Sequence, residues 1–297
     1  MTSDHRPTAP LLFLAIFMAV GAVSAAAIFI RLAGAPALSV AFHRNALAVA
    51  LLLPVVLLRR EPFPRGRALW LTLASGVALA FHFGLWIESL SHTSVAASVV
   101  LVCTQPIFVA VLARFVLKER TSRLALAGIG VAFAGTVVIA LDESSGGAAL
   151  LGNLLALAGS VAVAVYVLIG RAVRASGTGL LPYAVVVYAT AAACLLVACV
   201  AFDAPLTGFS DETWLWIAAV TLGPQILGHT IFNWALKHVQ ASLLSGTILA
   251  EPVVSTLLAW VVLAEVPGRY TVAGGGVVLA GLALLIRGRE RAQPSTA

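Results

Sequence analysis

The polar side chains of this sequence that could do chemistry lie in the middle of long apolar stretches. Glu251 is at the centre of one stretch, between Ala250 and Pro252. A charged acid at that depth costs a few kcal/mol, and more if it faces lipid, so we expect Glu251 to face the protein interior. There it binds substrate or an ion or, in the alternative interpretation, bonds a neighbouring helix as a neutral acid. Thr247 and Ser255, one turn before and after, are expected on the same helix face.

A second group of polar residues, Gln225, His229 and Asn233, recurs every four residues along another apolar stretch. This spacing predicts a stripe on one face of a helix. An imidazole can carry a proton near neutral pH, and amides can bond carboxylate or amine groups, so the stripe would suit a cavity wall. Interhelical hydrogen bonding is an equally open interpretation. No second His or Cys stands at ligand spacing, so we predict no metal site and no cofactor.

Three consecutive polar residues, His43, Arg44 and Asn45, occupy a further apolar stretch and must point in three directions. Arg44 is too deep to reach the membrane surface, so it is expected to contact either a substrate carboxylate or a helix end. His43 is a further candidate for the cavity wall. His82 and Trp86, one turn apart, could line the same space, although core packing is the simpler interpretation for Trp86.

The composition indicates where these residues are placed. Only 10% of residues are charged, 61% are hydrophobic and the mean hydropathy is +1.04. A soluble domain has about a quarter charged residues, so the chain is predicted to be an integral membrane protein in contact with lipid. The net charge of +6 comes mostly from loops, which is typical of membrane orientation rather than of a nucleic-acid partner. All three cysteines are in apolar stretches, so no disulfide framework is expected.

Ten apolar stretches are long enough to cross the hydrocarbon core as helices, which takes roughly 20 residues each. They predict an all-α integral membrane fold with ten transmembrane helices and short connections. The predicted spans are residues 10–32, 38–58, 68–88, 93–117, 124–141, 150–171, 180–202, 213–236, 239–263 and 270–287.

The second half of the chain matches the first half at a constant offset. Pro252 follows Pro106 by 146 residues, and the same offset makes Gln105 the neutral counterpart of Glu251. Each proline lacks a backbone donor, which predicts a weak point in its helix. The other matched positions are Trp70 with Trp216, His92 with His238, Glu119 with Glu265, Arg123 with Arg269, and Gly128, Gly130 and Gly135 with Gly274, Gly276 and Gly281.

This match predicts two five-helix units, residues 10–141 and 150–287, with short cytoplasmic tails at 1–9 and 288–297. If the N-terminus is cytoplasmic, all but three of the 18 Lys and Arg residues lie in cytoplasmic segments, a strong positive-inside signal. Five spans per unit make the second unit enter the membrane from the opposite face.

Loop charges agree with this inversion. The loop 59–67 is basic, whereas its counterpart 203–212 is acidic, and the basic loop 118–123 has a counterpart, 264–269, that has nearly lost its positive charge. An inverted repeat of this kind favours alternating access about a site at the middle of the membrane.

Two pairs of glycines mark a flat face on the last span of each unit. Gly128 and Gly135 recur at seven residues in the fifth span, as do Gly274 and Gly281 in the tenth. Small residues let helices approach closely in a membrane. We expect these two spans to pack against their own halves as supports, rather than to form cavity walls.

The fourth span of each unit ends in the pattern Pro-x(10)-Leu-x-Glu. The pattern runs through Pro106, Leu117 and Glu119 in the first unit and through Pro252, Leu263 and Glu265 in the second. With the inverted ten-span arrangement, it resembles the drug/metabolite transporter superfamily, and more closely its bacterial EamA-type exporters. Arg44, in Phe-His-Arg, resembles the family's arginine in the second span, and the Glu-Pro pair at Glu251 resembles its acid-proline pair in the ninth. The resemblance covers residues 10–287.

The resemblance implies a basket in which spans one to four and six to nine surround a central cavity, with spans five and ten peripheral. Relatives export amino acids and other small metabolites, often with proton exchange. Many relatives carry a Trp before the position of Gly21, which this chain lacks, so no particular amino acid is assigned. Glu119 and Glu265 end helices near the membrane faces and are expected to make capping or loop contacts.

The predicted function is therefore a secondary-active transporter, and not an enzyme, of the bacterial cytoplasmic membrane, with both termini cytoplasmic. It would export amino acids or other small metabolites by alternating access, with proton coupling left open. Its partners are a small-molecule substrate, protons if it is coupled, and membrane lipid; its oligomeric state is left open. A passive channel or facilitator is the first alternative. An intramembrane enzyme using Glu251 and His229 as acid and base is the second, although no nucleophile stands at a suitable spacing.

Overall fold

The protein is built from helices throughout the part of the chain that the structure describes. The computed structural model describes residues 8–116, 122–142, 147–239, 244 and 248–292, and no strand occurs among them. Six helical segments are long and apolar enough to cross a membrane, and four shorter apolar helices accompany them. The prediction of an all-helical, multi-pass membrane protein is confirmed.

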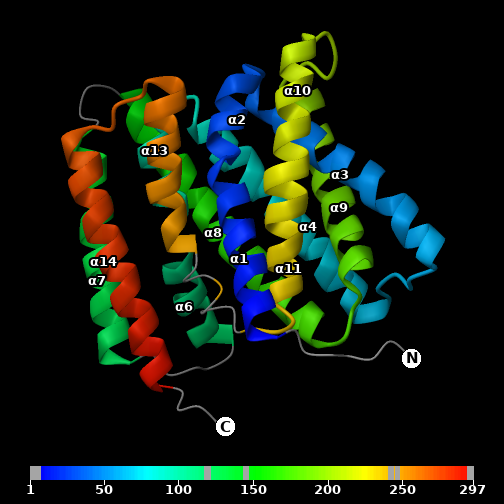
Figure 1. The fold of residues 1–297 in the computed structure, drawn as a ribbon, viewed down its shortest axis with the longest axis horizontal. Helices are drawn as coiled ribbons and strands as arrows, with labels where there is room; N and C mark the ends of the chain where they lie inside the picture. The colour runs from blue at the N-terminus through cyan, green and yellow to red at the C-terminus, as the bar shows by residue number, and fades with distance from the viewer. Residues whose placement is uncertain (1–7, 117–121, 143–146, 240–243, 245–247, 293–297) are drawn as a thin grey trace.

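Each of the ten predicted spans contains helix within the described residues, and several spans are divided. α1 begins and α14 ends at the same end of the bundle (Figure 1). In chain order the elements are α1 (Ala9–Ser24), α2 (Ala26–Ala33), α3 (Ala37–Arg59), α4 (Gly66–Ser89), α5 (Val95–Val102), α6 (Gln105–Val116), α7 (Arg123–Asp142), α8 (Gly147–Ala175), α9 (Leu180–Ala201), α10 (Asp211–Val220), the π-helix η1 (Thr221–Thr230), α11 (Ile231–Ala235), the 3-10 turn η2 (Ile248–Ala250), α13 (Glu251–Leu263) and α14 (Arg269–Ala292).

Two helices begin in the protein interior at positions that are equivalent under the 146-residue offset. α6 begins at Gln105 and α13 begins at Glu251, and both side chains are buried. A proline follows each of them in the first turn, where its missing N–H removes no helical hydrogen bond. The chain leaves the helical path at Cys103 and Thr104 before α6, and the turn η2 precedes α13. The fourth and ninth predicted spans are therefore interrupted near their middles, each with a helix N-terminus inside the protein.

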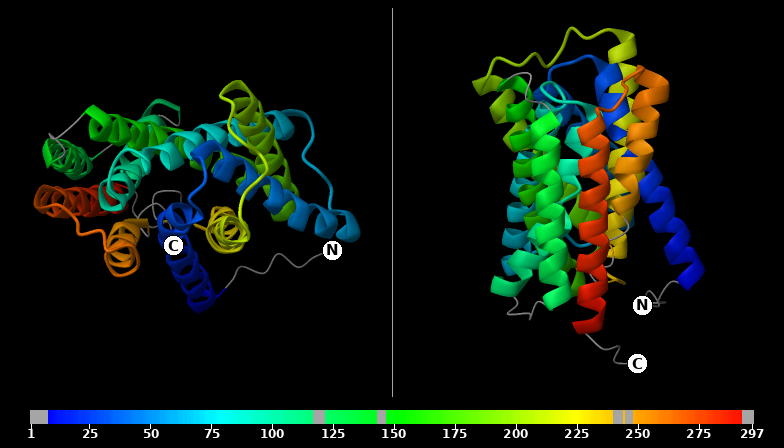
Figure 2. Two further views of the ribbon diagram at one scale, coloured as in Figure 1. Left: turned by 90° about the horizontal axis from the view of Figure 1, so that it is seen from above. Right: turned by 90° about the vertical axis from the view of Figure 1, so that its left-hand side faces the viewer.

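The glycine faces of α7 and α14 pack against each other, so the expectation that each would pack against its own half is wrong. A Cβ atom added at Gly281 would lie 2.7 Å from the Gly128 carbonyl oxygen, and one added at Gly135 would lie 2.7 Å from the Gly274 carbonyl oxygen. The start of α7 thus meets the end of α14 and the reverse, so the two helices lie side by side and antiparallel (Figure 2). Two flat faces approach each other more closely than either could approach bulky side chains.

The contact between α7 and α14 is symmetric: each residue contact has a counterpart in which both residues are replaced by their equivalents in the other half. Gly135 and Gly281 are equivalent positions, and their carbonyl partners are equivalent as well. Cβ atoms added at these glycines would also meet the backbone nitrogens of Val278 and Ala132 respectively, which are again offset equivalents. An interface in which every contact has such a counterpart is isologous, the kind that forms about a two-fold axis.

The other contacts between the two halves show the same symmetry. α3 packs on α9, which contain the second span of each half, and α5 packs on α13, which belong to the fourth. The third span of the first half, α4, packs on α8, the first span of the second half. In the equivalent contact, the third span of the second half packs on the first span of the first half: α10 packs on α2, and η1 packs on α1. The pattern of packing is thus the same when the halves change places.

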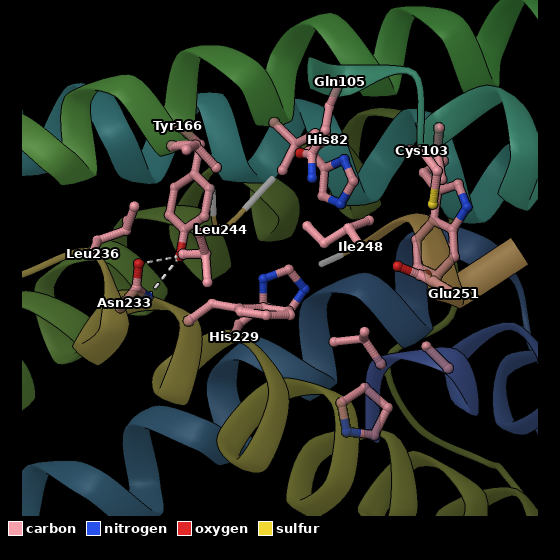
Figure 3. A pocket seen from close by; sticks show the side chains of 18 residues that line it. His82, Cys103, Gln105, Tyr166, His229, Asn233, Leu236, Leu244, Ile248 and Glu251 are labelled. Atoms are coloured by element: carbon pink, nitrogen blue, oxygen red, sulfur yellow. Dashed lines mark hydrogen bonds between the residues drawn. The ribbon is translucent and has the colours of Figure 1, made fainter. Parts of the chain in front are cut away.

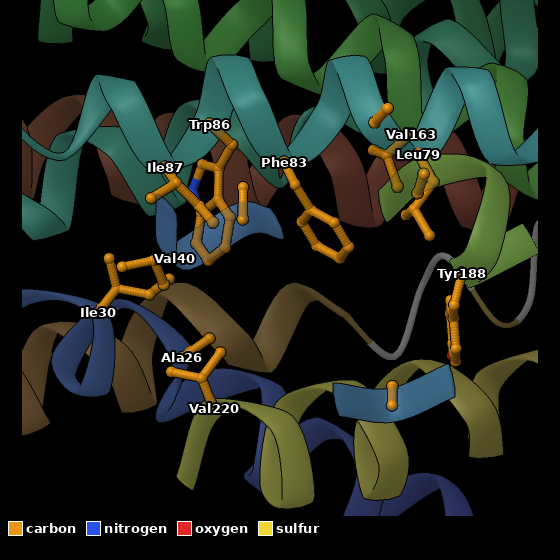
Figure 4. Packing of buried hydrophobic residues seen from close by; sticks show 14 of the residues in the cluster. Ala26, Ile30, Val40, Leu79, Phe83, Trp86, Ile87, Val163, Tyr188 and Val220 are labelled. Carbon is orange, nitrogen blue, oxygen red and sulfur yellow. The ribbon is translucent and has the colours of Figure 1, made fainter. Parts of the chain in front are cut away.

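A buried apolar cluster joins helices of both halves. Val40 of α3, Phe83 of α4, Tyr188 of α9 and Val220 of α10 belong to it (Figure 4). Because the surrounding solvent is lipid, this packing stabilises the fold through van der Waals contact more than through removal of apolar surface from water. The cluster therefore holds the helices in fixed positions around the polar residues.

Glu265 joins the two halves at the end of the bundle where α2 ends. Its Oε1 accepts a hydrogen bond at 2.6 Å from the backbone N–H of Val95, the first residue of α5, and its Oε2 lies 3.7 Å from Arg31 Nη2. Arg31 Nη2 also donates to the Thr93 carbonyl oxygen at 3.0 Å. A carboxylate is favoured at a helix N-terminus by the helix dipole. Glu265 therefore caps α5 from the opposite half.

Replacing Glu265 by alanine is expected to lower the free energy of unfolding by roughly 1–2 kcal/mol, because it removes both the cap of α5 and the ion pair. Thermal unfolding of the purified protein in detergent would measure the loss. The matched control is Glu212→Ala in the exposed first turn of α10, for which a change within about 0.5 kcal/mol is expected. Equal effects of the two substitutions would contradict a capping role.

Candidate functional site

A small cavity lies between the two halves and has both polar and apolar walls. Its volume is about 70 Å³, and it is lined from α1, α2, α4, α5, α6, α8, η1, α11, η2 and α13 (Figure 3). These elements belong to the first, third and fourth spans of each half, so the equivalent parts of both halves contribute. A pocket that encloses a small organic ligand usually has ≈ 300–1,000 Å³. The present conformation is therefore contracted around a space for only a few waters.

Five of the predicted site residues line this cavity. They are His82, Gln105, His229, Asn233 and Glu251. Figure 3 shows Glu251 at one end, Asn233 at the other and the two histidines between them. They come from five elements, α4, α6, η1, α11 and α13, so only the packing of the helices brings them together.

Glu251 is the first residue of α13 and is 8% exposed. Its carboxyl group lies beside the side chain of Cys103, which belongs to the interruption before α6 (Figure 3). The N-terminus of α13 also favours negative charge on the carboxylate. Gln105, its counterpart at the start of α6, is buried, and its Oε1 has no hydrogen-bond partner among the described residues. The two helix starts thus present a carboxyl group and an amide to the same cavity.

The opposite end of the cavity holds a pair of reciprocal hydrogen bonds. The Tyr166 hydroxyl donates to Asn233 Oδ1 at 2.9 Å, and Asn233 Nδ2 donates to the same hydroxyl oxygen at 2.6 Å (Figure 3). Tyr166 belongs to α8 and Asn233 to α11. The pair forms a polar end wall whose members are already satisfied.

Two histidines form the middle of the cavity wall. His82 Nδ1 is 3.0 Å from the Gly159 carbonyl oxygen, and its ring stacks on Trp86 with centroids 5.8 Å apart. Since a carbonyl can only accept, Nδ1 carries the hydrogen, which leaves Nε2 of neutral His82 as an acceptor. The His229 ring lies 6.3 Å from the His82 ring. Trp86 Nε1 has no hydrogen-bond partner in the described structure.

Gln225 does not line the cavity, although it was predicted on the same stripe as His229 and Asn233. The reason is the π-helix η1, which contains Gln225 and His229. Its hydrogen bonds run from residue i to i+5, so each residue turns through a smaller angle than in an α-helix, and the residues of η1 that line the cavity are Pro224 and His229, five apart. Gln225 instead accepts a hydrogen bond from Arg44 Nε at 2.8 Å and donates one to Asn45 Oδ1 at 3.2 Å. The stripe prediction therefore holds for the last two residues only.

Other predicted residues lie away from the cavity. Arg44 is fully buried behind Phe83. His43 bonds the Ser39 carbonyl oxygen at 2.8 Å through Nδ1 and packs edge-on against Trp214. The expectation that three consecutive side chains point in three directions holds only in part, because His43 has partners of its own whereas Arg44 and Asn45 both bond Gln225.

Ser255 also lies away from the cavity. Its hydroxyl donates to the Ser24 carbonyl oxygen at 2.7 Å, which ties α13 to α1. Thr247, expected beside Glu251, lies outside the described residues.

Sequence reasoning gave little weight to three cavity residues. Tyr166, Cys103 and Trp86 all line the space. For Cys103 a signal existed, because it comes two residues before Gln105 and therefore just before the predicted helix break. Among the described residues, no group of three or more His, Cys, Asp or Glu side chains could hold a metal ion.

Comparison with known proteins identifies the family. The model of the EamA-like transporter family matches the chain twice, over residues 9–141 and 150–287. The chain belongs to the EamA-like transporter family. The family and the names of its relatives therefore place this EamA protein among transporters, not among a class of enzymes.

The relatives of this EamA protein are themselves described only as transporters. It is 26% identical over 287 residues to an uncharacterized transporter of Archaeoglobus fulgidus, covering 92% of this chain and 96% of that one. It is 27% identical over 196 residues to the uncharacterized transporter YyaM of Bacillus subtilis, covering 63% of each. A crystal structure with 21% identity matches with a TM-score of 0.67 over 93% of this chain and 96% of the other, a likeness of fold alone.

Proposed function

We propose that this protein is a secondary-active transporter that exports amino acids or other small metabolites across the bacterial cytoplasmic membrane by alternating access. It has ten membrane spans arranged as two inverted repeats, residues 10–141 and 150–287. Both termini are cytoplasmic, in keeping with the basic loops on that side. The cavity is the substrate site, and it opens alternately to the two faces as one half rocks against the other.

The observation that carries this proposal is the composition of the cavity wall. It is built from the first, third and fourth spans of each half, and the contacts between the halves survive their exchange. Two copies of one unit that face each other about a two-fold axis can adopt two related conformations, each with the roles of the halves reversed. A site between the copies is then reachable from either side in turn.

The side chains of the cavity have distinct roles in this proposal. Glu251 exchanges a proton or binds a substrate ammonium group, since a buried acid in a membrane is costly unless it is used. Gln105, His82, His229 and Asn233 line the path and bond the polar groups of the substrate.

The other predicted residues act around this path. Gln225 and His43 hold the surrounding helices, Ser255 joins α13 to α1, and Pro106 and Pro252 mark the places where the fourth and ninth spans bend. Thr247 remains a candidate contact beside the acid.

The test is uptake of labelled amino acids and small metabolites into proteoliposomes, with and without an imposed pH gradient. Saturable flux that responds to the gradient is expected for at least one compound. Saturable flux that ignores both pH and ion gradients would instead establish a passive facilitator. Chemical conversion of a compound without net flux would identify an intramembrane enzyme and overturn the proposal.

A further inference from the structure

Arg44 is a buried cation whose two terminal nitrogens have no hydrogen-bond partner among the described residues. The residue is 0% exposed, and neither Nη1 nor Nη2 makes a hydrogen bond within the described structure. Only Nε is bonded, to Gln225 Oε1. The ion pairs of the described residues do not include Arg44. A buried charge without a counter-charge is strongly unfavourable, so an anion is expected to reach this group at some stage.

Another buried arginine shows that the fold can satisfy such a group. Arg174 of α8 is 3% exposed, and its Nε donates to the Asn233 carbonyl oxygen at 3.2 Å while Nη1 donates to the Thr178 carbonyl oxygen. Carbonyl oxygens at helix ends and turns are sufficient to hold a structural guanidinium. Arg44 lies in the middle of α3, where the backbone carbonyls are used by the helix itself.

Phe83 separates Arg44 from the cavity. The Arg44 Cζ atom lies 3.9 Å from the centroid of the Phe83 ring. The His229 ring, which lines the cavity, meets Phe83 edge-on with centroids 5.2 Å apart. The order is therefore cavity, His229, Phe83, guanidinium. Phe83 is fully buried in the cluster of Figure 4 and follows the cavity residue His82 directly in α4.

We propose that Nη1 and Nη2 of Arg44 form a subsite for the carboxylate of the transported substrate, and that Phe83 covers this subsite in the present conformation. With Nε held by Gln225, the free edge of the guanidinium is the two-pronged end that binds a carboxylate through two parallel hydrogen bonds. Movement of Phe83 would also enlarge a cavity that is too small for a metabolite. The inference rests on the proposed transport function and names its substrate class as small carboxylic acids, amino acids among them.

The experiment compares each L-amino acid with its own amide, which differs only at the carboxylate. Binding is measured by thermal shift of the full-length protein in detergent, so no flux is required. The acid of at least one pair is expected to stabilise the wild type at concentrations where the amide does not. Arg44→Met is expected to abolish this difference, and Arg44→Lys to keep part of it, because a lysine offers the charge without the fork. Equal stabilisation by acids and amides, or by neither, would overturn the subsite.

Two matched variants separate binding from folding. Arg174→Met removes hydrogen-bonded contacts and is expected to lower the Tm while keeping the preference for acids. Arg44→Met is expected to leave the Tm near that of the wild type, since a buried unpaired charge is lost, while the preference disappears. A large fall in Tm for Arg44→Met, with the preference retained, would show that Arg44 is only structural.

The cover is tested by Phe83→Leu, with Phe29→Leu as its control. Phe29 stacks on Trp216, whereas the guanidinium of Arg44 lies over Phe83. Removal of the cover is expected to lower the apparent Kd of the acid several-fold, because a subsite that is open in a minor fraction of molecules binds more weakly by that fraction. Unchanged acid affinity in Phe83→Leu would overturn the cover. Flux without selectivity for acids would support the proposed transport and overturn the carboxylate subsite. Selective binding of acids without flux would support the subsite and overturn the proposed transport.

Discussion

Replacing Gly281 by alanine is expected to lower the free energy of unfolding by about 1–3 kcal/mol, although only one methyl group is added. The new Cβ atom would lie 2.7 Å from the Gly128 carbonyl oxygen, against backbone that cannot move without separating α7 from α14. Gly135→Ala should have a similar effect, because its Cβ atom would lie 2.7 Å from the Gly274 carbonyl oxygen in the equivalent contact. Thermal unfolding in detergent, with the yield of monodisperse protein, measures the loss.

The same helices supply the control. Gly276 of α14 and Gly130 of α7 are exposed equivalents, and an added Cβ atom at either meets nothing within 4 Å. Alanine at these two positions is expected to be neutral or to stabilise the helix by up to about 1 kcal/mol, since it restricts the backbone more than glycine does. If Gly276→Ala and Gly281→Ala unfold at the same temperature, the packing of α7 on α14 is not what these glycines serve.

Replacing Glu251 by glutamine is expected to abolish gradient-driven transport, with a fall in flux of at least about tenfold, or 1.4 kcal/mol. Glutamine keeps the size of the side chain and its polar end beside Cys103, so the fold should be preserved. It cannot exchange a proton and cannot offer a negative charge to an ammonium group. Counterflow and gradient-driven uptake in proteoliposomes distinguish the two roles: an uncoupled carrier retains counterflow, whereas a carrier without its ligand loses both.

The control for Glu251→Gln is Glu212→Gln, which removes the same charge from the exposed start of α10. It is expected to leave both flux and its response to the pH gradient unchanged. Unaltered transport and unaltered gradient dependence in Glu251→Gln would sink the proposed role of the acid, and would favour its alternative interpretation as a neutral contact between helices.

The cavity is contracted in this conformation, and several buried polar groups around it favour its opening. In the present conformation the Gln105 amide oxygen, the Trp86 indole nitrogen and the Arg44 guanidinium end make no hydrogen bond within the described part of the chain. Each buried polar atom left unpaired costs roughly 1–3 kcal/mol, so together they favour any conformation that admits a polar ligand. The capping contact of Glu265 and the apolar cluster oppose that change. A substrate that binds the free groups would shift the balance toward an opened state.

Much of the architecture follows from the sequence by itself. Low charge and sustained hydropathy are sufficient for a helical membrane protein, because lipid requires every backbone group to be bonded within its own helix. The 146-residue offset, from Pro106 to Pro252, predicts that the two halves are built alike. A lone acid in an apolar stretch must turn inward, and Glu251 does so because lipid penalises its charge at any other angle.

Only the tertiary structure decided which polar residues share a cavity. Gln225 left the predicted stripe because a π-helix turns each residue through a smaller angle than an α-helix, so that Pro224 and His229 face the cavity, and hydropathy carries no signal for that change. The glycine faces of α7 and α14 found each other because complementarity between two surfaces is a property of the pair. The same holds for Phe83, which covers Arg44: an apolar ring in an apolar helix looks ordinary until the position of the neighbouring helix is known.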